Sequence, residues 1–289
     1  MSMQAMTWMR EHTPQTAGAS LAEVEAGAHP EYGVLAPWDE GHQLVALAQR
    51  PNVANPFGIE WFYPGIVRAA KFWLAPSSQL ATAMALSGAR YAVLSFRLGL
   101  LRDEALFAEE DPDLYAQKTE EGYRPGPQFW SLGAVRAFLE AAPVGAPPDF
   151  DPLSPPVPGV RLIWEGGQLE PDSPAQAFLP KGHAAYKIIE RVAGATVEVH
   201  TQPGAKVEAS QQVVTPTGRR FLWTASSLAD GRGVASLQAV YSTQGLPSDW
   251  ARGDGPLQLE LPEGHLTLSL SEEDILQGRT RTLPEPALE

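Results

Sequence analysis

The sequence predicts an α+β protein: an N-terminal α/β layer with a small parallel sheet and helices, followed by an antiparallel β-sandwich or barrel module. Three observations predict it. Short apolar runs alternate with amphipathic stretches in the first half, the order of strands and helices in a parallel α/β layer. A proline-rich stretch interrupts this pattern. Beyond residue 184, apolar residues recur at every second position between glycine-containing turns, as they do in antiparallel sheets.

In the first half, each predicted element depends on a local signal. A first helix stops before Pro14, because proline disfavours helix at the residue before it, and the small, polar residues 15–31 form a loop. Pro64 fits the first position of a helix, and Ser77 or Ser78 caps a helix that Gly88 ends. Helices are expected at 4–12, 42–49, 64–74, 78–87 and 130–141, and strands at 32–36, 53–58 and 89–96.

The second half begins with prolines between residues 142 and 158, a semi-rigid connector at a module boundary. A strand resumes at 160–164, and Gly166-Gly167 fits a hairpin turn. Further strands are expected at 186–192, 195–200, 206–209, 220–225, 234–241, 257–261 and 265–270. These patterns predict three parts: an α/β domain at 1–145, a connector with a strand pair at 146–183, and an antiparallel β domain at 184–289.

Composition excludes several classes of function. The net charge of −13 repels nucleic-acid phosphate, so no nucleic-acid partner is expected. The chain has no cysteine, which excludes disulfides, thiolate catalysis and cysteine-ligated metals. Its six histidines are scattered, without the spacing of a metal site. No apolar run reaches the ~18 residues of a membrane helix, and residues 1–14 lack the apolar segment of a signal peptide.

One segment combines residues that suit ligand binding. Pro37-Trp38-Asp39-Glu40-Gly41 lies where a buried strand turns into a helix, and open α/β sheets bind ligands at the carboxyl ends of their strands. An indole N–H donates and a carboxylate accepts, so the two can hold a small hydroxyl group. From the residues alone, a second interpretation stays open, in which Trp38 is a core residue and Asp39 caps the helix.

The order of motifs resembles the C-terminal domain of oligosaccharyltransferase catalytic subunits, which are membrane glycosyltransferases of the GT-C type. Those proteins carry Trp-Trp-Asp-Tyr-Gly after a short strand. The resemblance rests on Trp8 to Pro14, Tyr32 to His42, Ala48 to Gly58, Gly88 to Leu94, Tyr186 to Ala195, Tyr241 to Thr243 and Ser271 to Gly278. It therefore extends over nearly the whole chain.

The resemblance implies a role in binding the acceptor of a glycan. In the family, the Trp-Trp-Asp part recognises the Ser/Thr hydroxyl of an Asn-x-Ser/Thr sequon. By motif, Trp38 and Asp39 hold that role and Gly41 keeps the turn tight. Glu40 is counted with them as an acceptor-binding residue. Pro37 stands in place of the first Trp and Glu40 in place of Tyr. A hydroxyl site lacking one donor loses about 1–3 kcal/mol, so a different acceptor is also open.

The resemblance also implies what this chain lacks. The catalytic acidic residues and a divalent metal belong to a membrane-embedded portion, so no catalytic residue, metal ligand or cofactor is expected here. The expected partners are that portion, an acceptor polypeptide and a lipid-linked oligosaccharide, on the extracytoplasmic face of a membrane. We expect an excised domain or half of a split protein, inactive alone. The alternative is a stand-alone glycan-binding or adaptor module of the cell envelope, with Trp164, Trp223 and Trp250 as stacking platforms.

Overall fold

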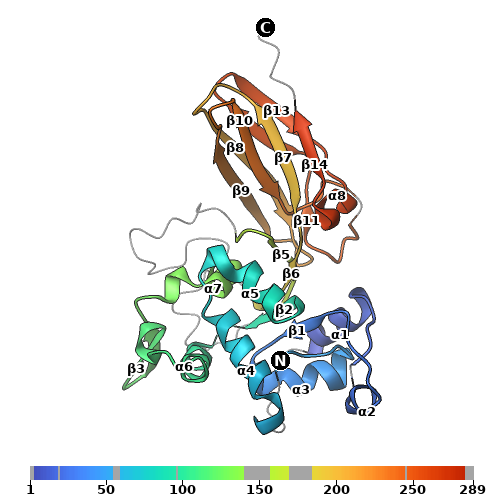
Figure 1. The fold of residues 1–289 in the computed structure, drawn as a ribbon, viewed down its shortest axis with the longest axis vertical. Coiled ribbons are helices and arrows are strands. Elements are labelled where there is room, and N and C mark those ends of the chain that lie inside the picture. Colours follow the sequence, from blue (N-terminus) through green and yellow to red (C-terminus); the bar gives the residue numbers. More distant parts are fainter. Residues whose placement is uncertain are drawn as a thin grey trace. The chain divides into compact units, whose positions relative to one another are not determined.

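The computed structural model describes residues 3–18, 20–54, 59–95, 97–139, 157–168, 184–244 and 246–283. The chain divides into two compact units, Met1–Phe150 with Glu165–Arg191, and Asp151–Trp164 with Val192–Glu289 (Figure 1). Helices and strands mix in the first unit and strands dominate the second, which confirms the predicted α+β class. The division at 1–145, 146–183 and 184–289 stays a prediction, because much of its middle part lies outside the described residues.

The helices of the first unit agree with the predicted positions in part. The short helix α2 lies within the predicted loop 15–31, and α6 has no counterpart among the predicted helices. Pro64 lies inside α4 rather than at its first position. No serine side chain caps α5, which follows a 3-10 turn at Ser77–Gln79. The helices are α1 (Met3–His12), α2 (Leu21–Glu25), α3 (Gly41–Gln43), α4 (Ile59–Trp73), α5 (Leu80–Leu86), α6 (Leu98–Phe107) and α7 (Gly133–Leu139).

The main sheet of the first unit has four strands in the order β1-β2-β6-β5. Its edge strand β5 (Val160–Gln168) begins in the part of the chain that belongs to the second unit. Strands β1 (Gly33–Leu35) and β2 (Ala89–Ser95) are parallel, whereas β2 and β6 (Ala184–Arg191) are antiparallel, so the sheet is mixed rather than parallel as predicted. Helices α4 to α7 lie on one side of β1 and β2 and α1 on the other (Figure 1). A separate hairpin joins β3 (Ala116–Thr119) to β4 (Gly122–Pro125).

Three further predictions for this part of the chain differ from the structure. Strand β5 (Val160–Gln168) runs through Gly166 and Gly167, which therefore form no hairpin turn. Strand β6, which the sequence pattern assigns to the β-rich part, pairs with β2 instead. Of the strand expected at 53–58, Val53 and Ala54 are not in a strand, and 55–58 lie outside the described residues.

A buried arginine fixes the segment that follows the candidate site to the end of α1. Arg50 is 1% exposed, and its guanidinium donates to the carbonyl oxygens of Arg10, Thr13, Ala48 and Gln49 and to the Thr13 hydroxyl. The first two carbonyls end α1 and the other two end the π-helical turn Leu44–Ala48 that follows α3. One cation thus satisfies unpaired carbonyls at two helix ends, where cations are stabilising.

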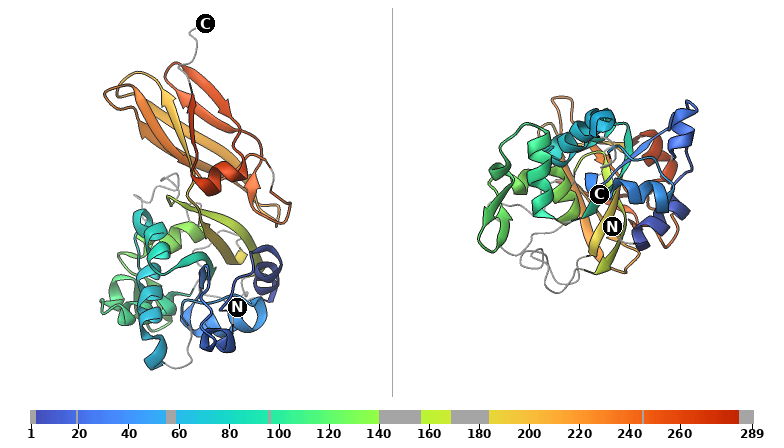
Figure 2. Two further views of the ribbon diagram at one scale, coloured as in Figure 1. Left: turned by 45° about the vertical axis from the view of Figure 1, so that its right-hand side comes forward. Right: turned by 90° about the horizontal axis from the view of Figure 1, so that it is seen from below.

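The second unit consists of two sheets with a shared core. One has the order β10-β7-β14; the other has the order β11-β8-β12-β13, with β9 also on β8. Figure 2 shows the strands of this unit in yellow to red. Alternate residues are buried along β7, β8, β10 and β12, as the period-two pattern predicts. Among the described residues of this unit, the strand pairings are antiparallel except for the parallel pair β7 and β14. The elements are β7 (Ala195–His200), β8 (Lys206–Val214), β9 (Arg220–Leu228), β10 (Val234–Ala239), β11 (Arg252–Gly253), β12 (Leu257–Leu261), β13 (Gly264–Leu268), α8 (Glu272–Gln277) and β14 (Thr280–Leu283).

Candidate functional site

The candidate site begins at the 3-10 turn Trp38–Glu40, directly after β1. Pro37 precedes the turn with φ −48°, and Glu40 leads into α3. The residues at the N-cap positions of the turn and of α3 are Pro37 and Glu40, and neither makes a side-chain cap bond. The prediction that Asp39 caps the helix is therefore wrong, and its carboxylate is directed to another partner.

That partner is Arg97, which stands between β2 and α6. Its two terminal nitrogens donate to both oxygens of Asp39, at 2.9 Å and 2.8 Å. One of them also lies 3.2 Å from Oε1 of Glu40. Since β1 and β2 are parallel neighbours, their carboxyl ends meet at one edge of the sheet. This edge brings together residues that are 58 positions apart in the chain.

The ion pair sets the charge of Asp39. Partial burial raises the pKa of the Asp39 carboxyl, but the hydrogen bonds and charge of Arg97 outweigh it and hold the pKa below its usual value. Asp39 and Arg97 both keep about two fifths of their side-chain surface exposed. The site thus presents an ionised, solvent-accessible carboxylate.

Trp38 lies beside this carboxylate and is half-buried. Its ring packs edge-to-face on Phe107 of α6, with centroids 5.6 Å apart. Its indole N–H is buried and has no hydrogen-bond partner among the described residues. Buried donors are rarely left unpaired, so a water molecule or a ligand group that reaches this N–H would satisfy it.

Two further acidic residues of α6 contribute to the field at this edge. Glu104 is fully buried, and neither carboxyl oxygen has a hydrogen-bond partner within the described part of the chain. Burial, together with the charges of Asp103 and Asp39, raises the pKa of Glu104 well above its usual value. Burial and Asp39 also raise the pKa of Asp103. Of these carboxyls, only Asp39 is held charged by a bidentate arginine.

Gly41 supports the turn by its lack of a side chain. A Cβ atom on Gly41 would lie 2.1 Å from the carbonyl oxygen of Ala54 and 2.8 Å from Nδ2 of Asn52. The Gly41 carbonyl also accepts a 2.6 Å hydrogen bond from Asn52. Its φ of −56° is ordinary for any residue, so close approach of two chain segments, not backbone conformation, requires glycine here.

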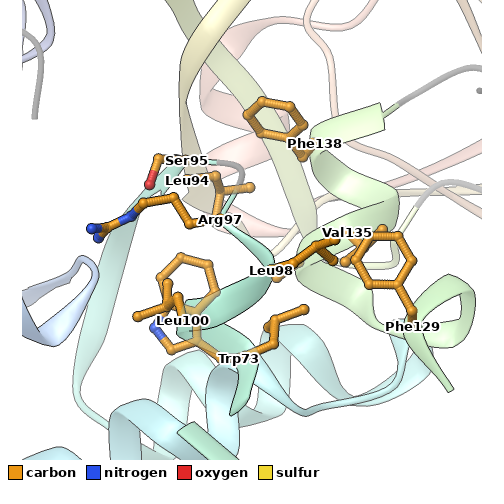
Figure 3. Close-up of a pocket in the computed structure, with 11 residues that line it drawn as sticks. Trp73, Leu94, Ser95, Arg97, Leu98, Leu100, Phe129, Val135 and Phe138 are labelled. Carbon is orange, nitrogen blue, oxygen red and sulfur yellow. The ribbon is translucent and has the colours of Figure 1, made fainter. Parts of the chain in front are cut away.

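An apolar pocket lies next to the ion pair. The side chain of Arg97 forms part of its lining together with Trp73, Leu94, Leu98 and other apolar residues (Figure 3). Two of its lining residues, Trp73 and Ser95, each have a buried polar atom, Nε1 and Oγ, without a partner among the described residues. The aliphatic part of Arg97 thus borders apolar surface, while its guanidinium reaches Asp39.

Other chemistry receives no support from the described ranges. They hold no group of three or more His, Cys, Asp or Glu side chains that could bind a metal. None of their helices combines the length and apolar character of a membrane span. Trp164 and Trp223 are 7% and 4% exposed, so they cannot be the sugar-stacking platforms that the alternative function required. Trp250 is half-buried.

The structure thus places Trp38, Asp39 and Glu40 together in one turn, and Gly41 follows them at the start of α3. Their role in binding an acceptor stays a prediction. Sequence reasoning missed Arg97, Phe107 and Glu104, which reach this edge from β2 and α6. The position of Arg97 directly beyond a predicted parallel strand was the signal that could have identified it.

Two parts of the chain match models of known protein families. Residues 1–99 match the family model of the AglB core domain, and residues 194–280 match that of the archaeal glycosylation protein B long peripheral domain. A curated relative is dolichyl-phosphooligosaccharide-protein glycotransferase 3 of Archaeoglobus fulgidus, 33% identical over 136 residues. That match covers 41% of this chain and 16% of the relative.

Solved structures with a similar fold are also oligosaccharyltransferases of Archaeoglobus fulgidus. AglB in complex with an inhibitory peptide and a dolichol-phosphate has a TM-score of 0.71 at 19% identity, over 99% of this chain and 43% of that one. An oligosaccharyltransferase in complex with Zn and sulfate has a TM-score of 0.70 at 18% identity, over 98% and 46% of the two chains. The chain therefore spans less than half the length of the proteins that it resembles.

Proposed function

The chain belongs to the AglB family of oligosaccharyltransferases, and from this membership we propose that it is the acceptor-side globular portion of a membrane-bound glycosyltransferase. In this role it helps to bind an acceptor polypeptide while a lipid-linked oligosaccharide is transferred. A structural relative contains a peptide and a dolichol-phosphate, and another is tethered to an acceptor peptide with an NVT sequon. We place the same classes of ligand on the protein to which this chain belongs.

The observation that carries the proposal is the pairing of an ionised carboxylate with an unpartnered indole N–H at one sheet edge. Asp39 can accept a hydrogen bond and Trp38 can donate one, which is the complement that a hydroxyl group requires. Glu40 lies beside them and shares Arg97, and Gly41 keeps the turn close to Ala54. We propose these four residues as the acceptor site.

Pro37 changes what this site can recognise. The catalytic subunits that this sequence resembles carry the first tryptophan of the motif at this position. Pro37 stands there instead and supplies no N–H donor. The loss of one donor weakens a hydroxyl site by about 1–3 kcal/mol. We propose that an Asn-x-Thr acceptor binds this edge more weakly than it would bind a site with two indoles.

We assign the remaining functions to the rest of the protein. Transfer of the glycan, the lipid-linked donor and a divalent metal belong to a membrane-embedded portion, on the same or a neighbouring chain. One solved relative contains Zn; here, Asp39 and Glu40 share one arginine, which disfavours a cation beside them. The globular portion then lies on the extracytoplasmic face of the membrane.

A peptide titration tests the acceptor site. The 289-residue chain is titrated with an Asn-x-Thr peptide and with a matched Asn-x-Ala peptide, and backbone and indole N–H resonances are followed by NMR. We expect the Trp38 indole and the Asp39 amide to shift with the first peptide and to shift less with the second. Asp39→Asn removes a charged acceptor, so binding should weaken by about tenfold or more.

Asp113→Asn is the matched control, because Asp113 is an exposed aspartate paired with an arginine of α6 outside the site. It should leave binding unchanged. Equal shifts with both peptides, or equal binding by the Asp39→Asn and Asp113→Asn variants, would contradict the proposed acceptor site.

A further inference from the structure

The ion pair of Asp39 with Arg97 has a geometry that restricts the carboxylate as well as neutralising it. Each carboxylate oxygen accepts from a different nitrogen of the same planar guanidinium, at 2.8 Å and 2.9 Å. Such a bidentate contact fixes the plane and direction of the carboxylate, which a single ammonium cannot do. Each oxygen has a further lone pair, so Asp39 still accepts hydrogen bonds from the exposed side.

Arg97 is itself held from several directions. It is the N-cap residue of α6 in an extended conformation, and Leu98, which follows it, is buried. Its stem lies against the apolar pocket beside Leu94 and Trp73 (Figure 3). Its guanidinium also lies 3.2 Å from Glu40. A restrained arginine loses less entropy when it holds a partner, so the orientation it gives to Asp39 is well defined.

Several acidic groups lie near Asp39, and Arg97 offsets their negative charge. Groups near the pair that carry negative charge or titrate are Glu40, Asp103, Glu104 and Tyr186. Apart from Arg97, the described cation nearest along α6 is Arg102, which pairs with Asp113 and the Ala116 carbonyl. Without Arg97, Asp39 would lose the partner whose hydrogen bonds and charge do most to lower its pKa.

We propose that Arg97 is a positioning residue for the acceptor: it holds the Asp39 carboxylate in one orientation, so that its exposed lone pairs receive an O–H or N–H group of the acceptor. This inference rests on the proposed function of the site. It also restricts the ligand chemistry. Two carboxylates share one cation here, so the site favours neutral hydrogen-bond donors over carboxylate groups.

The test compares three variants of the 289-residue chain. Arg97→Gln removes the positive charge and the bidentate contact. Arg97→Lys keeps the charge without the bidentate contact. Arg102→Gln removes an arginine of α6 that does not contact Asp39. Two quantities are measured in each: the titration of the Asp39 carboxyl carbon by ¹³C NMR, and binding of the Asn-x-Thr peptide at about pH 5 and about pH 7.

The expected results separate charge from orientation. In Arg97→Gln, the pKa of Asp39 rises, because the hydrogen bonds and the charge of Arg97 no longer offset its burial. Peptide binding falls by about tenfold at pH 7 and falls further at pH 5. In Arg97→Lys, the pKa returns most of the way, but binding recovers only in part. Arg102→Gln moves neither quantity.

Several outcomes would overturn the inference. They are wild-type binding by Arg97→Gln at both pH values, full recovery of binding by Arg97→Lys, and an equal effect of Arg102→Gln. In each case a loss of binding in Asp39→Asn would still support the proposed function. If Asp39→Asn also binds like the wild type, or if the wild type binds neither peptide at millimolar concentration, the proposed function itself is wrong.

Discussion

Replacing Gly41 with alanine should destabilise the first unit, because the space for a side chain is already occupied. A Cβ atom would lie 2.1 Å from the Ala54 carbonyl oxygen, 2.8 Å from Asn52 Nδ2 and 3.1 Å from the Ala54 carbonyl carbon. Two of these atoms belong to the backbone and cannot rotate away. The 3-10 turn and the segment around residue 54 must therefore separate by about 1 Å to restore ordinary contact distances.

The size of the effect follows from three contributions. Overpacking at a rigid contact costs about 1–3 kcal/mol. Separation also lengthens the 2.6 Å hydrogen bond from Asn52 to the Gly41 carbonyl, which is worth about 1 kcal/mol. Alanine regains about 1 kcal/mol through its greater helix propensity, since Gly41 begins α3 with a helical φ. The net loss in free energy of unfolding is therefore about 1–3 kcal/mol.

Urea unfolding monitored by tryptophan fluorescence measures this loss. Gly99→Ala is the matched control, because Gly99 lies in α6 and the atoms nearest to a Cβ there belong to the half-exposed Tyr123 ring, at 3.3 Å and beyond. The control should be neutral or more stable by up to about 1 kcal/mol. If Gly41→Ala is as stable as Gly99→Ala, the close contact with Ala54 does not constrain the turn and the reasoning fails.

Three further measurements test other parts of the fold. Arg50→Met leaves several carbonyls unpaired at the ends of two helices, so the free energy of unfolding, measured by urea denaturation, should fall by about 3 kcal/mol or more. A loss below about 1 kcal/mol would contradict the stabilising role of Arg50. Ser271→Ala removes the capping box of α8 and should cost about 1 kcal/mol in the same assay, whereas no change would mean that Asp274 caps the helix alone. Burial raises the pKa of Asp274, but hydrogen bonds from Ser271 and Arg281 outweigh it and lower the pKa to about 2. Asp274 therefore stabilises the second unit fully above its usual pKa of 3.8, and this contribution should disappear as the pH falls from about 4 toward 2, but not in Asp274→Asn.

The predicted helices and strands agree with the structure where one face of an element is apolar and its ends carry a signal. Strand β2 and helix α1 are of this kind, and Gly88 ends α5 with φ +70° as its position suggested. Helix α6 was missed because its apolar residues occupy several faces: 98, 100, 101, 105, 106 and 107 are all apolar. No single stripe distinguishes such a segment from an irregular one.

Strand β6 shows why the alternating pattern of the second half led to a wrong prediction: the pattern assigned β6 to the β-rich part, but β6 pairs with β2. Four consecutive residues, Lys187 to Glu190, are buried, and β6 is an inner strand between β2 and β5. Two of these four residues are charged, which hides a continuous buried strand from any hydropathy pattern. The charges are tolerated because Glu190 pairs with Arg90 at 2.7 Å and Lys187 lies 3.7 Å from Glu165.

The same limit applies to the candidate site, with a functional consequence. Trp38 and Asp39 are neighbours in sequence, so a motif can identify them together. Whether the Asp39 carboxylate is ionised alone, protonated or ion-paired depends on Arg97. The pairing of β1 with β2 brings Arg97 next to Asp39. The motif therefore predicts the location of a carboxylate but not its charge or its direction, and these two properties decide which acceptor group can bind. A related chain with the same Trp-Asp pair and no arginine beyond the second strand would have a less acidic, less oriented carboxylate. The residue after the neighbouring parallel strand should thus be compared whenever such a motif is used to predict an acceptor.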